Sequence, residues 1–301
     1  MHLNRTIIIY NSVQYFVPLF IEKGLPTYKM YKDIPYLLKF LRKISLQLGL
    51  FRSFWFDDWK RIIKSIDTVI VFSTNPINTV ADIKEINPSL RVIFWYWNPI
   101  LKKGIKPSDI SNSLCEKWSF DKKDCEKYNL HYNTSFYFDN ITLPNIALQY
   151  DITFVGVDKG RKKDLILLDE KMREKGLNNK FYIVDDNWNK KDHSGINKPI
   201  NYSEYLKLVS ESKAILDFVQ EGQTGLTLRP LESMFLNKKL ITNDAEIVNQ
   251  DFYNPNNIFV LGRDSMDKIK EFIDAPFIAV PESVKLRYDV TNWLDRFFIE
   301  Q

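Results

Sequence analysis

A glycine, an arginine and a glutamate that could hold a phosphorylated ligand lie close together in the chain, at Gly225, Arg229 and Glu232. Pro230 suits the first turn of a helix, because the N–H group that proline lacks would have no helical partner there. A helix N-terminus offers unbonded N–H groups and the positive end of the helix dipole, and both favour a bound phosphate. The spacing therefore predicts an anion-binding turn, with Arg229 just before the helix and Glu232 within its first turn.

Two apolar runs of strand length flank this turn, from Ala214 to Val219 and from Lys239 to Thr242. Gly222 and Gly225 break the chain between the first run and the helix. Strand, glycine-bearing loop, helix and strand together make a βαβ unit, which is a common frame for nucleotide binding. The alternative is an ordinary βαβ unit in which Glu232 is only a favourable acid in the first helical turn.

The run from Thr224 to Glu232, with the sequence TGLTLRPLE, resembles the donor-binding signature of GT-B glycosyltransferases. The resemblance implies that Glu232 takes the ribose hydroxyls of a nucleotide-sugar, while Arg229 and the loop amides face its diphosphate. When Glu232 is aligned with the second family glutamate, Thr224 stands at the first, so the acidic pair of retaining enzymes is incomplete. This leaves the stereochemical outcome open and favours an inverting enzyme. The predicted donor-binding residues of this segment are Thr224, Gly225, Leu226, Thr227, Leu228, Arg229 and Glu232.

A second strand-and-glycine pattern begins at Tyr150 and is followed by a helix predicted from Lys163 to Lys175. In GT-B enzymes a strand, a glycine and a basic loop of this type begin the donor domain. The resemblance implies that Gly156, Lys159 and Arg161 approach the donor diphosphate, since glycine permits close approach and the cations offset phosphate charge.

Apolar runs and helical patterns alternate along the rest of the chain as well. The alternation predicts an α/β protein, and with the resemblance it indicates a GT-B fold of two Rossmann-like, doubly wound domains that face a central cleft. Strands are predicted at residues 6–10, 67–73, 91–97, 180–184 and 257–261, and helices at 33–49, 78–87, 202–212 and 284–298.

The stretch from Asp139 to Gln149 has little periodicity and contains Pro144, and it is the predicted domain boundary. Residues 1–148 are predicted to form an N-terminal, acceptor-binding Rossmann-like domain. Residues 149–283 are predicted to form a C-terminal, nucleotide-sugar-binding one. Residues 284–301 are predicted to hold a helix that crosses back to the N-terminal domain.

Asn11, Trp97 and Asn98 follow the carboxyl ends of two predicted strands, where ligands lie in a doubly wound sheet. An aromatic ring at Trp97 could stack on a sugar, so these three are acceptor-side candidates; a strand packed beneath a helix is the alternative. Glycosyl transfer to a hydroxyl also needs a base. The candidates are Asp57 and Asp58, which lie among aromatic residues, with Asp121 behind them.

Residues 118–132 have the pattern WSFDxxDxxxYxLxY, before a short strand predicted at Phe136–Phe138. The pattern predicts a helix opened by Ser119 or Asp121. It is similar to that of small bacterial transferases of lipopolysaccharide and capsular polysaccharide assembly, and this match is looser than the donor signature.

Basic and aromatic residues are interleaved from Lys23 to Arg61, and residues 1–148 hold 20 Lys and Arg against 13 Asp and Glu. Such a mixture fits an anionic membrane surface, where aromatic rings lie at the headgroup level. A solvated helix face beside a buried aromatic cluster is an equal alternative. The patterns of nucleic-acid-binding motifs are missing, so nucleic acid is not an expected partner.

Hydrophobic residues make up 45% of the chain and charged residues 27%, which is typical of a soluble globular protein and excludes a disordered one. Two cysteines and three histidines do not build a metal cluster of usual spacing, so no metal and no cofactor are expected. A secretory leader and an apolar run of membrane-spanning length are also missing. The expected location is the cytoplasm. A peripheral position at the inner face of the plasma membrane is compatible with the same features.

These features predict a metal-independent glycosyltransferase of bacterial surface polysaccharide synthesis. It would move a sugar from a nucleotide-sugar donor to a glycan or a lipid-linked acceptor. A sugar-nucleotide epimerase or hydrolase of the same fold, and a non-catalytic partner subunit of a transferase, remain the alternatives.

Overall fold

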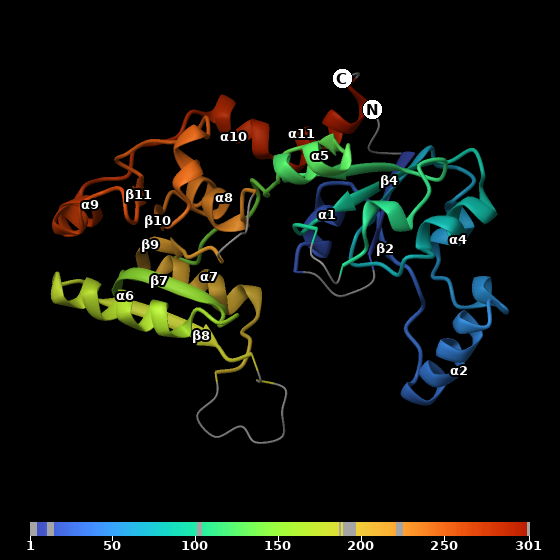
Figure 1. Ribbon diagram of the computed structural model, residues 1–301, viewed down its shortest axis with the longest axis horizontal. Helices are drawn as coiled ribbons and strands as arrows, with labels where there is room; N and C mark the ends of the chain where they lie inside the picture. Colours follow the sequence, from blue (N-terminus) through green and yellow to red (C-terminus); the bar gives the residue numbers. More distant parts are fainter. Residues whose placement is uncertain are drawn as a thin grey trace. The chain divides into compact units, whose positions relative to one another are not determined.

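The computed structural model describes residues 5–10, 15–100, 104–186, 188, 197–220 and 225–299. The chain divides into two compact units. Unit 1 comprises Met1–Thr134 together with Leu294–Gln301, and unit 2 comprises Ser135–Trp293. Each unit is built on its own sheet of parallel strands (Figure 1). Over the described residues, no helix combines the length and apolar character that are needed to cross a bilayer.

The sheet of unit 1 has six described strands in the order β2-β1-β3-β4-β5-β6. Its central strands are the apolar, β-branched runs of the sequence, as expected of strands that are covered on both faces. The strands are β1 (Thr6–Tyr10), β2 (Thr27–Lys29), β3 (Thr68–Phe72), β4 (Arg91–Tyr96), β5 (Glu116–Ser119) and β6 (His131–Tyr132). The helices of unit 1 are α1 (Val17–Glu22), α2 (Tyr36–Gln47), α3 (Trp59–Ile62), α4 (Thr79–Ile86) and α5 (Lys122–Tyr128).

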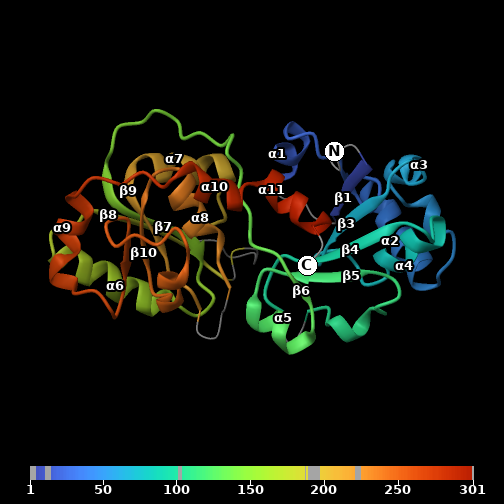
Figure 2. The ribbon, with the colours of Figure 1, turned by 90° about the horizontal axis from the view of Figure 1, so that it is seen from above.

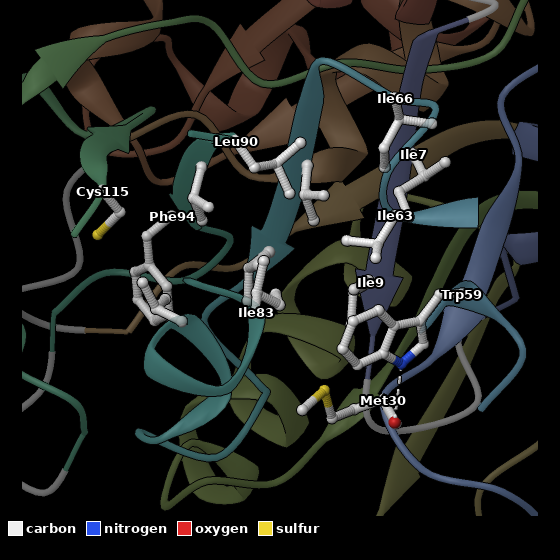
Figure 3. Packing of buried hydrophobic residues seen from close by; sticks show 14 of the residues in the cluster. Ile7, Ile9, Met30, Trp59, Ile63, Ile66, Ile83, Leu90, Phe94 and Cys115 are labelled. Carbon is white, nitrogen blue, oxygen red and sulfur yellow. Dashed lines mark hydrogen bonds between the residues drawn. The ribbon is translucent and has the colours of Figure 1, made fainter. Parts of the chain in front are cut away.

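One face of this sheet packs against α3 and α4. Alternate side chains of the strands, such as Ile7 and Ile9 of β1, join Ile83 of α4 in one buried cluster (Figure 3). Trp59 of α3 is fully buried there and donates its Nε1–H to the carbonyl of Met30 at 3.0 Å. The cluster therefore holds a large indole without leaving its polar atom unbonded.

The opposite face of the same sheet is covered by α1 and by the C-terminal segment. Phe20 of α1 lies edge-on to Phe72 of β3, with ring centres 6.1 Å apart. Phe297 packs against Trp95 of β4 at 5.9 Å and against Trp118 of β5 at 4.9 Å. The end of the chain thus completes the aromatic core of unit 1.

The sheet of unit 2 has five described strands in the order β11-β10-β9-β7-β8. Figure 2 shows α7 and α8 on one side of it and α6 on the other. The buried clusters agree, since α6 and α9 share one cluster and α7, α8 and α10 share the other. The strands are β7 (Tyr150–Val157), β8 (Asn179–Val184), β9 (Ser212–Asp217), β10 (Lys239–Thr242) and β11 (Ile258–Val260). The helices are α6 (Lys162–Glu174), α7 (Tyr202–Ser210), α8 (Leu228–Phe235), α9 (Ile269–Asp274) and α10 (Glu282–Tyr288). Helix α11 (Val290–Asp295) spans the division between the two units, which falls after Trp293.

The predicted strand at Phe136–Phe138 is not a strand of either sheet. Tyr137 instead forms a single bridge with Asp289, and its backbone exchanges hydrogen bonds with Tyr288 and Val290. Phe136 packs on Trp293 with ring centres 4.3 Å apart. These contacts explain why the compact units divide after Thr134, earlier in the chain than the poorly periodic stretch suggested.

The closing helix is not continuous, contrary to the prediction of one helix over 284–298. It breaks at Asp289, which has an extended backbone, into α10 and α11, and a 3₁₀ turn follows at Arg296–Phe298. The side chain of Asp289 accepts the N–H of Thr291 at 2.9 Å and so helps to open α11. The bridge to Tyr137 supplies the long-range contact that interrupts the helical pattern.

The helix predicted from Asp33 to Gly49 is shorter at its start. It begins at Tyr36, with Pro35 at the N-cap position and no side-chain cap. Asp33, which was the predicted cap, forms an ion pair with Lys29 instead. The short strands β2, β5 and β6 were not predicted, because their sequences, TYK, EKWS and HY, contain no apolar run.

Candidate functional site

The strand order of unit 2 reverses between β7 and β9, because β8 follows β7 on one side and β9 follows on the other. In open parallel sheets ligands bind outside the carboxyl ends of the strands at such a reversal. A cavity of about 620 Å³ lies there. Its lining comes from the segments after β7, β9 and β10: Lys159, Gly160, Arg161, Asp164, Phe218, Val219, Gln220, Asn243, Asp244 and Ala245.

A tight turn after β7 presents the two cations of this cavity. Lys159 and Gly160 both have positive φ, at 48° and 81°, and the N–H of Lys159 donates to Asp186 at 3.0 Å. Gly160 adopts this conformation without the steric cost that a side chain carries. The turn therefore brings the Arg161 side chain back over the end of the strand.

Arg161 is held by main-chain carbonyls at two strand ends. Its guanidinium donates to Val157 at 2.8 Å and to Phe218, which lies just beyond β9. The same group lies 5.7 Å from the centre of the Phe154 ring. Arg161 thus ties the carboxyl ends of β7 and β9 together at the reversal point.

Arg229, in the first turn of α8, reaches the same place from the other side. Its guanidinium donates to the carbonyl of Val155, pairs with Asp217 at 3.7 Å and lies 5.5 Å from the centre of the Phe154 ring. A side chain at Gly156 would oppose this approach, because a Cβ built there lies 3.1 Å from Arg229 Nη2. The glycine that the sequence marked therefore makes room for an arginine of its own chain.

Three cations converge at this edge of the sheet, and the pKa values reflect their crowding. Desolvation, with the neighbouring Arg229 charge, lowers the pKa of Arg161. Desolvation also lowers the pKa of Lys159, and both Arg161 and Arg229 add to that shift. The shifts mean that the protonated cations are destabilised where they stand, and a bound anion would offset their repulsion and compensate for their lost hydration.

Asp217, the last residue of β9, is the carboxylate that balances Arg229. It is 2% exposed and accepts the hydroxyl of Thr227 at 2.8 Å. Burial raises its pKa, while Arg229 acts in the opposite direction. Sequence reasoning did not select Asp217. The signal was an acid that ends an apolar strand directly before the glycine loop.

Glu232 lies inside unit 2 and is 4% exposed. Tyr205 donates its hydroxyl to one carboxylate oxygen at 2.5 Å, and Tyr202 donates to the other at 3.2 Å. The Tyr202 hydroxyl also shares a hydrogen bond with that of Tyr137. Burial raises the pKa of Glu232, and the bond from Tyr205 acts against that rise. The two tyrosines were missed, although their spacing of three residues places both on one face of α7.

The remaining predicted residues of this segment form the approach to α8. Gly225 has a φ of 88°, which glycine adopts readily. The carbonyl of Leu226 accepts the hydroxyl of Ser135 at 3.0 Å. Thr227 occupies the N-cap position of α8 and Leu228 begins the helix, so Arg229 lies inside the first turn and Glu232 lies just beyond it, contrary to the prediction that placed Arg229 before the helix and Glu232 in the first turn. Thr224 lies outside the described residues.

The acceptor-side candidates fall near strand ends of unit 1. Trp97, just beyond β4, is half-buried and packs on Phe16 at 4.9 Å and on Phe72 at 5.6 Å between ring centres. Asn98 is exposed. Asn11 lies outside the described residues. Trp97 therefore has the packing role that was the alternative for it, with part of its ring still accessible.

The three candidate bases have different surroundings. Asp57 follows the Tyr31–Phe56 bridge, and its charge acts on Tyr10 and Lys29 at the carboxyl ends of β1 and β2. Asp58 is exposed and lies 3.4 Å from Arg61.

Asp121 is 1% exposed and caps α5, since it accepts the N–H groups of Lys123 and Asp124 at 2.9 and 3.2 Å. Asp57 differs from the other two acids. It lies at strand ends, whereas Asp121 caps a helix and Asp58 pairs with Arg61 at the surface.

The strand order of unit 1 also reverses, between β1 and β3, and Asn75 lies at that point. Its amide donates to the carbonyls of Ile9 at 2.9 Å and Phe72 at 2.8 Å, which joins the ends of β1 and β3. This residue had no sequence signal, because its partners are far away in the chain. Within the described ranges, no group of three or more His, Cys, Asp or Glu could hold a metal ion.

Comparison with known proteins places this arrangement in a fold class. The sequence matches no protein-family model and no curated protein. Solved structures do match. A DNA-modifying β-glucosyltransferase aligns over 97% of this chain and 97% of its own, with a TM-score of 0.56 and 13% identity. A UDP-forming α,α-trehalose-phosphate synthase from Burkholderia xenovorans aligns over 98% of each chain, with a TM-score of 0.50 and 10% identity.

The glycosyltransferase fold is shared with TarM as well, at a TM-score of 0.50 and 12% identity. That match covers 77% of this chain and 54% of TarM, so this chain spans about half of TarM's length. Likeness at these identities concerns the fold. The chain has the GT-B fold of glycosyltransferases, with one parallel α/β sheet in each unit, and the fold class predicted from the sequence is confirmed.

Proposed function

We propose that this protein is a glycosyltransferase that binds a nucleotide-sugar in unit 2. The observation that carries the proposal is the convergence of Arg161, Arg229 and Lys159 at the reversal point of the sheet. These cations repel one another and are desolvated, as expected of a site that contains a bound anion in its functional state. A diphosphate fits, because its two negative charges match the net charge of the three cations and Asp217, and its oxygens accept guanidinium donors.

The roles of the other residues follow from their places. The N-terminus of α8, reached through Gly225 and Thr227, adds main-chain N–H groups for the phosphates. Glu232 takes the ribose hydroxyls, since each carboxylate oxygen keeps a lone pair beyond its tyrosine bond. UDP-glucose is the substrate of the β-glucosyltransferase of similar fold, which supports a nucleotide-sugar here.

Transfer to the acceptor is assigned to unit 1, with Asp57 as the base that takes the hydroxyl proton. Loss of the diphosphate leaving group is helped by Arg161, Arg229 and the α8 N-terminus, which stabilise its charge without a metal. The acceptor is a glycan or a lipid-linked glycan of bacterial surface polysaccharide synthesis. This rests on the likeness of residues 118–132 to such transferases and implies work at the inner face of the plasma membrane.

Donor binding is tested by thermal shift with UDP-, GDP-, CMP- and TDP-sugars. One nucleotide class should raise the melting temperature, and Arg229→Lys should remove most of that rise, because lysine cannot reproduce the forked contacts of arginine. Lys285→Ala, a change at a partly exposed lysine of α10 that does not line the cavity, is the control and should keep the shift. An Arg229→Lys variant that binds the best donor as tightly as wild type would refute the site.

Turnover separates the proposal from its alternatives. Release of nucleoside diphosphate that requires an acceptor indicates a transferase, and release or isomerisation without an acceptor indicates an epimerase or hydrolase. Donor binding with no turnover on a panel of glycan and lipid-linked acceptors would favour a non-catalytic partner. Asp57→Asn should lower turnover at least a hundredfold with unchanged donor affinity.

A further inference from the structure

Helix α2 contacts the rest of unit 1 through polar groups. The Trp55 indole donates to Ser45 Oγ at 2.7 Å, and Arg42 donates to the carbonyl of Lys32 at 2.9 Å. None of the residues of α2 is buried. A surface helix normally packs its apolar stripe on the core and turns its polar side to water. α2 does the opposite, and Figure 1 shows it standing away from the sheet of unit 1.

The outward side of α2 is apolar. Leu37, Leu41 and Leu48 lie on one stripe of the helix, because their spacings of four and seven residues return to the same side. All the residues of this surface are more than half exposed, from 53% at Leu41 to 84% at Tyr36. We call it the α2 apolar face, and it consists of Tyr36, Leu37, Phe40, Leu41, Leu48 and Phe51. Single exposed apolar residues are ordinary, but six within sixteen positions form a patch that needs an occupant.

The charge around this face has one sign. No acidic residue occurs between Asp33 and Asp57, whereas Lys39, Arg42, Lys43 and Arg52 do. Arg52 is paired internally with Asp82 at 2.7 Å, and Arg42 is directed at the body of the unit. Lys39 and Lys43 are exposed and lie on the polar side of the helix, beside Tyr36 and Phe40. An occupant must therefore be apolar at its centre and negative at its border.

We propose that the α2 apolar face docks on an anionic lipid surface. A helix with a wide apolar side, aromatic residues and lysines at its border lies in the plane of the headgroups. At 12 residues α2 is too short to cross a bilayer. A second copy of this chain fits less well, because two-fold pairing of the face would bring its lysines against like charges. The inference stands apart from the proposed sugar-nucleotide site, which lies in unit 2.

Vesicle co-sedimentation tests the proposal with the full chain. Wild type should partition onto phosphatidylcholine vesicles that contain 30% phosphatidylglycerol, and it should bind pure phosphatidylcholine far less. Leu37→Ser with Phe40→Ser and Leu41→Ser should lower the partition coefficient at least a hundredfold, since three apolar side chains no longer enter the interface. Lys39→Gln with Lys43→Gln should lower it about thirtyfold on anionic vesicles only.

The matched control uses exposed apolar residues elsewhere, Ile166 and Leu167 of α6, which are 45% and 50% exposed. Ile166→Ser with Leu167→Ser should leave partitioning unchanged. Unfolding midpoints show whether each variant is folded, and the donor thermal shift should be the same in all of them. Partitioning that survives the triple serine change would overturn the proposal. The proposal would also be overturned if wild type did not bind vesicles and instead formed a dimer, seen in sedimentation velocity, that the triple serine change dissociates.

Discussion

Tyr205 of α7 donates its hydroxyl to the Glu232 carboxylate of α8 at 2.5 Å, in a part of unit 2 where both side chains are buried. Burial raises the pKa of both groups, most clearly that of Tyr205. The bond therefore joins two groups that are each costly to ionise in that place. It keeps the carboxylate of a proposed ligand residue in one orientation.

Glu232→Gln should stabilise the protein at high pH. The folded pKa of Glu232 is raised above its ordinary value of 4.5, so the folded state binds more protons than the unfolded state above pH 4.5. The stability that Glu232 contributes is thus present at low pH and is lost as the pH rises through the folded pKa.

Urea unfolding of wild type and Glu232→Gln between pH 4 and pH 8 measures this effect. The two proteins should be similar near pH 4, and the variant should become the more stable one as the pH rises. A difference that is independent of pH would contradict the assignment.

Arg229→Ala should destabilise unit 2 by about 3 to 5 kcal/mol, because Asp217 is left buried without its partner. The double change Arg229→Ala with Asp217→Asn should recover most of that loss, since no charge remains uncompensated. The affinity for the donor should stay at least tenfold weaker than in wild type in both variants. Urea unfolding measures the stability of each variant, and calorimetric titration measures its donor affinity. Recovery of donor binding in the double variant would assign Arg229 a structural role alone.

Gly156→Ala should weaken donor binding and lower the free energy of unfolding by about 1 to 3 kcal/mol. The new methyl group would meet Phe154 at 3.0 Å and Arg229 at 3.1 Å, so the guanidinium must move. Gly176→Ala is the control, because it introduces strain at a φ of 78° with open space around the methyl group. That control should cost about 1 kcal/mol and leave donor affinity intact.

Phe297→Ala should destabilise unit 1 by about 3 to 4 kcal/mol, because a buried ring between Trp95 and Trp118 is lost. Ile299→Ala, at a position that is 63% exposed, should change the free energy of unfolding by less than about 0.5 kcal/mol. Equal effects of the two changes in urea unfolding would show that the C-terminal segment does not complete the core.

Both cysteines should react with thiol reagents only after unfolding. Burial raises the pKa of Cys115 and of Cys125 to about 11, so about one thiol in a thousand is ionised at pH 8. Absorbance with a disulfide reagent should show two thiols in guanidinium chloride and a far slower reaction in buffer. A fast native reaction of either thiol would place it at the surface.

Much of the secondary structure follows from local patterns. The strand predicted at Lys239–Thr242 is β10 with the same bounds, and Pro230 lies in the first turn of α8. The N-cap of α5 is Asp121, one of the two expected residues. These elements were predictable, because β-branched runs, a proline in a first helical turn and a capping acid act over a few residues.

Other features depart from the prediction or arise from contacts between distant segments. The helix predicted to begin at Asp33 starts at Tyr36, because Pro35 has an extended ψ of 150° and the helical conformation is disfavoured for a residue that precedes proline. The short β2 owes its existence to pairing with β1 and carries no pattern of its own. The pattern of α2 predicted an amphipathic helix correctly, but it could not show which side of the helix meets the protein.

The sequence by itself determined the two parallel α/β sheets and the turn that enters α8, since backbone preferences and apolar periodicity are local. Only the tertiary structure decided that Arg229 meets Asp217, that two tyrosines hold Glu232, and that α2 faces outward with its leucines. Those pairings depend on how strands far apart in the chain line up beside one another. The order of the strands is set by packing of the whole sheet.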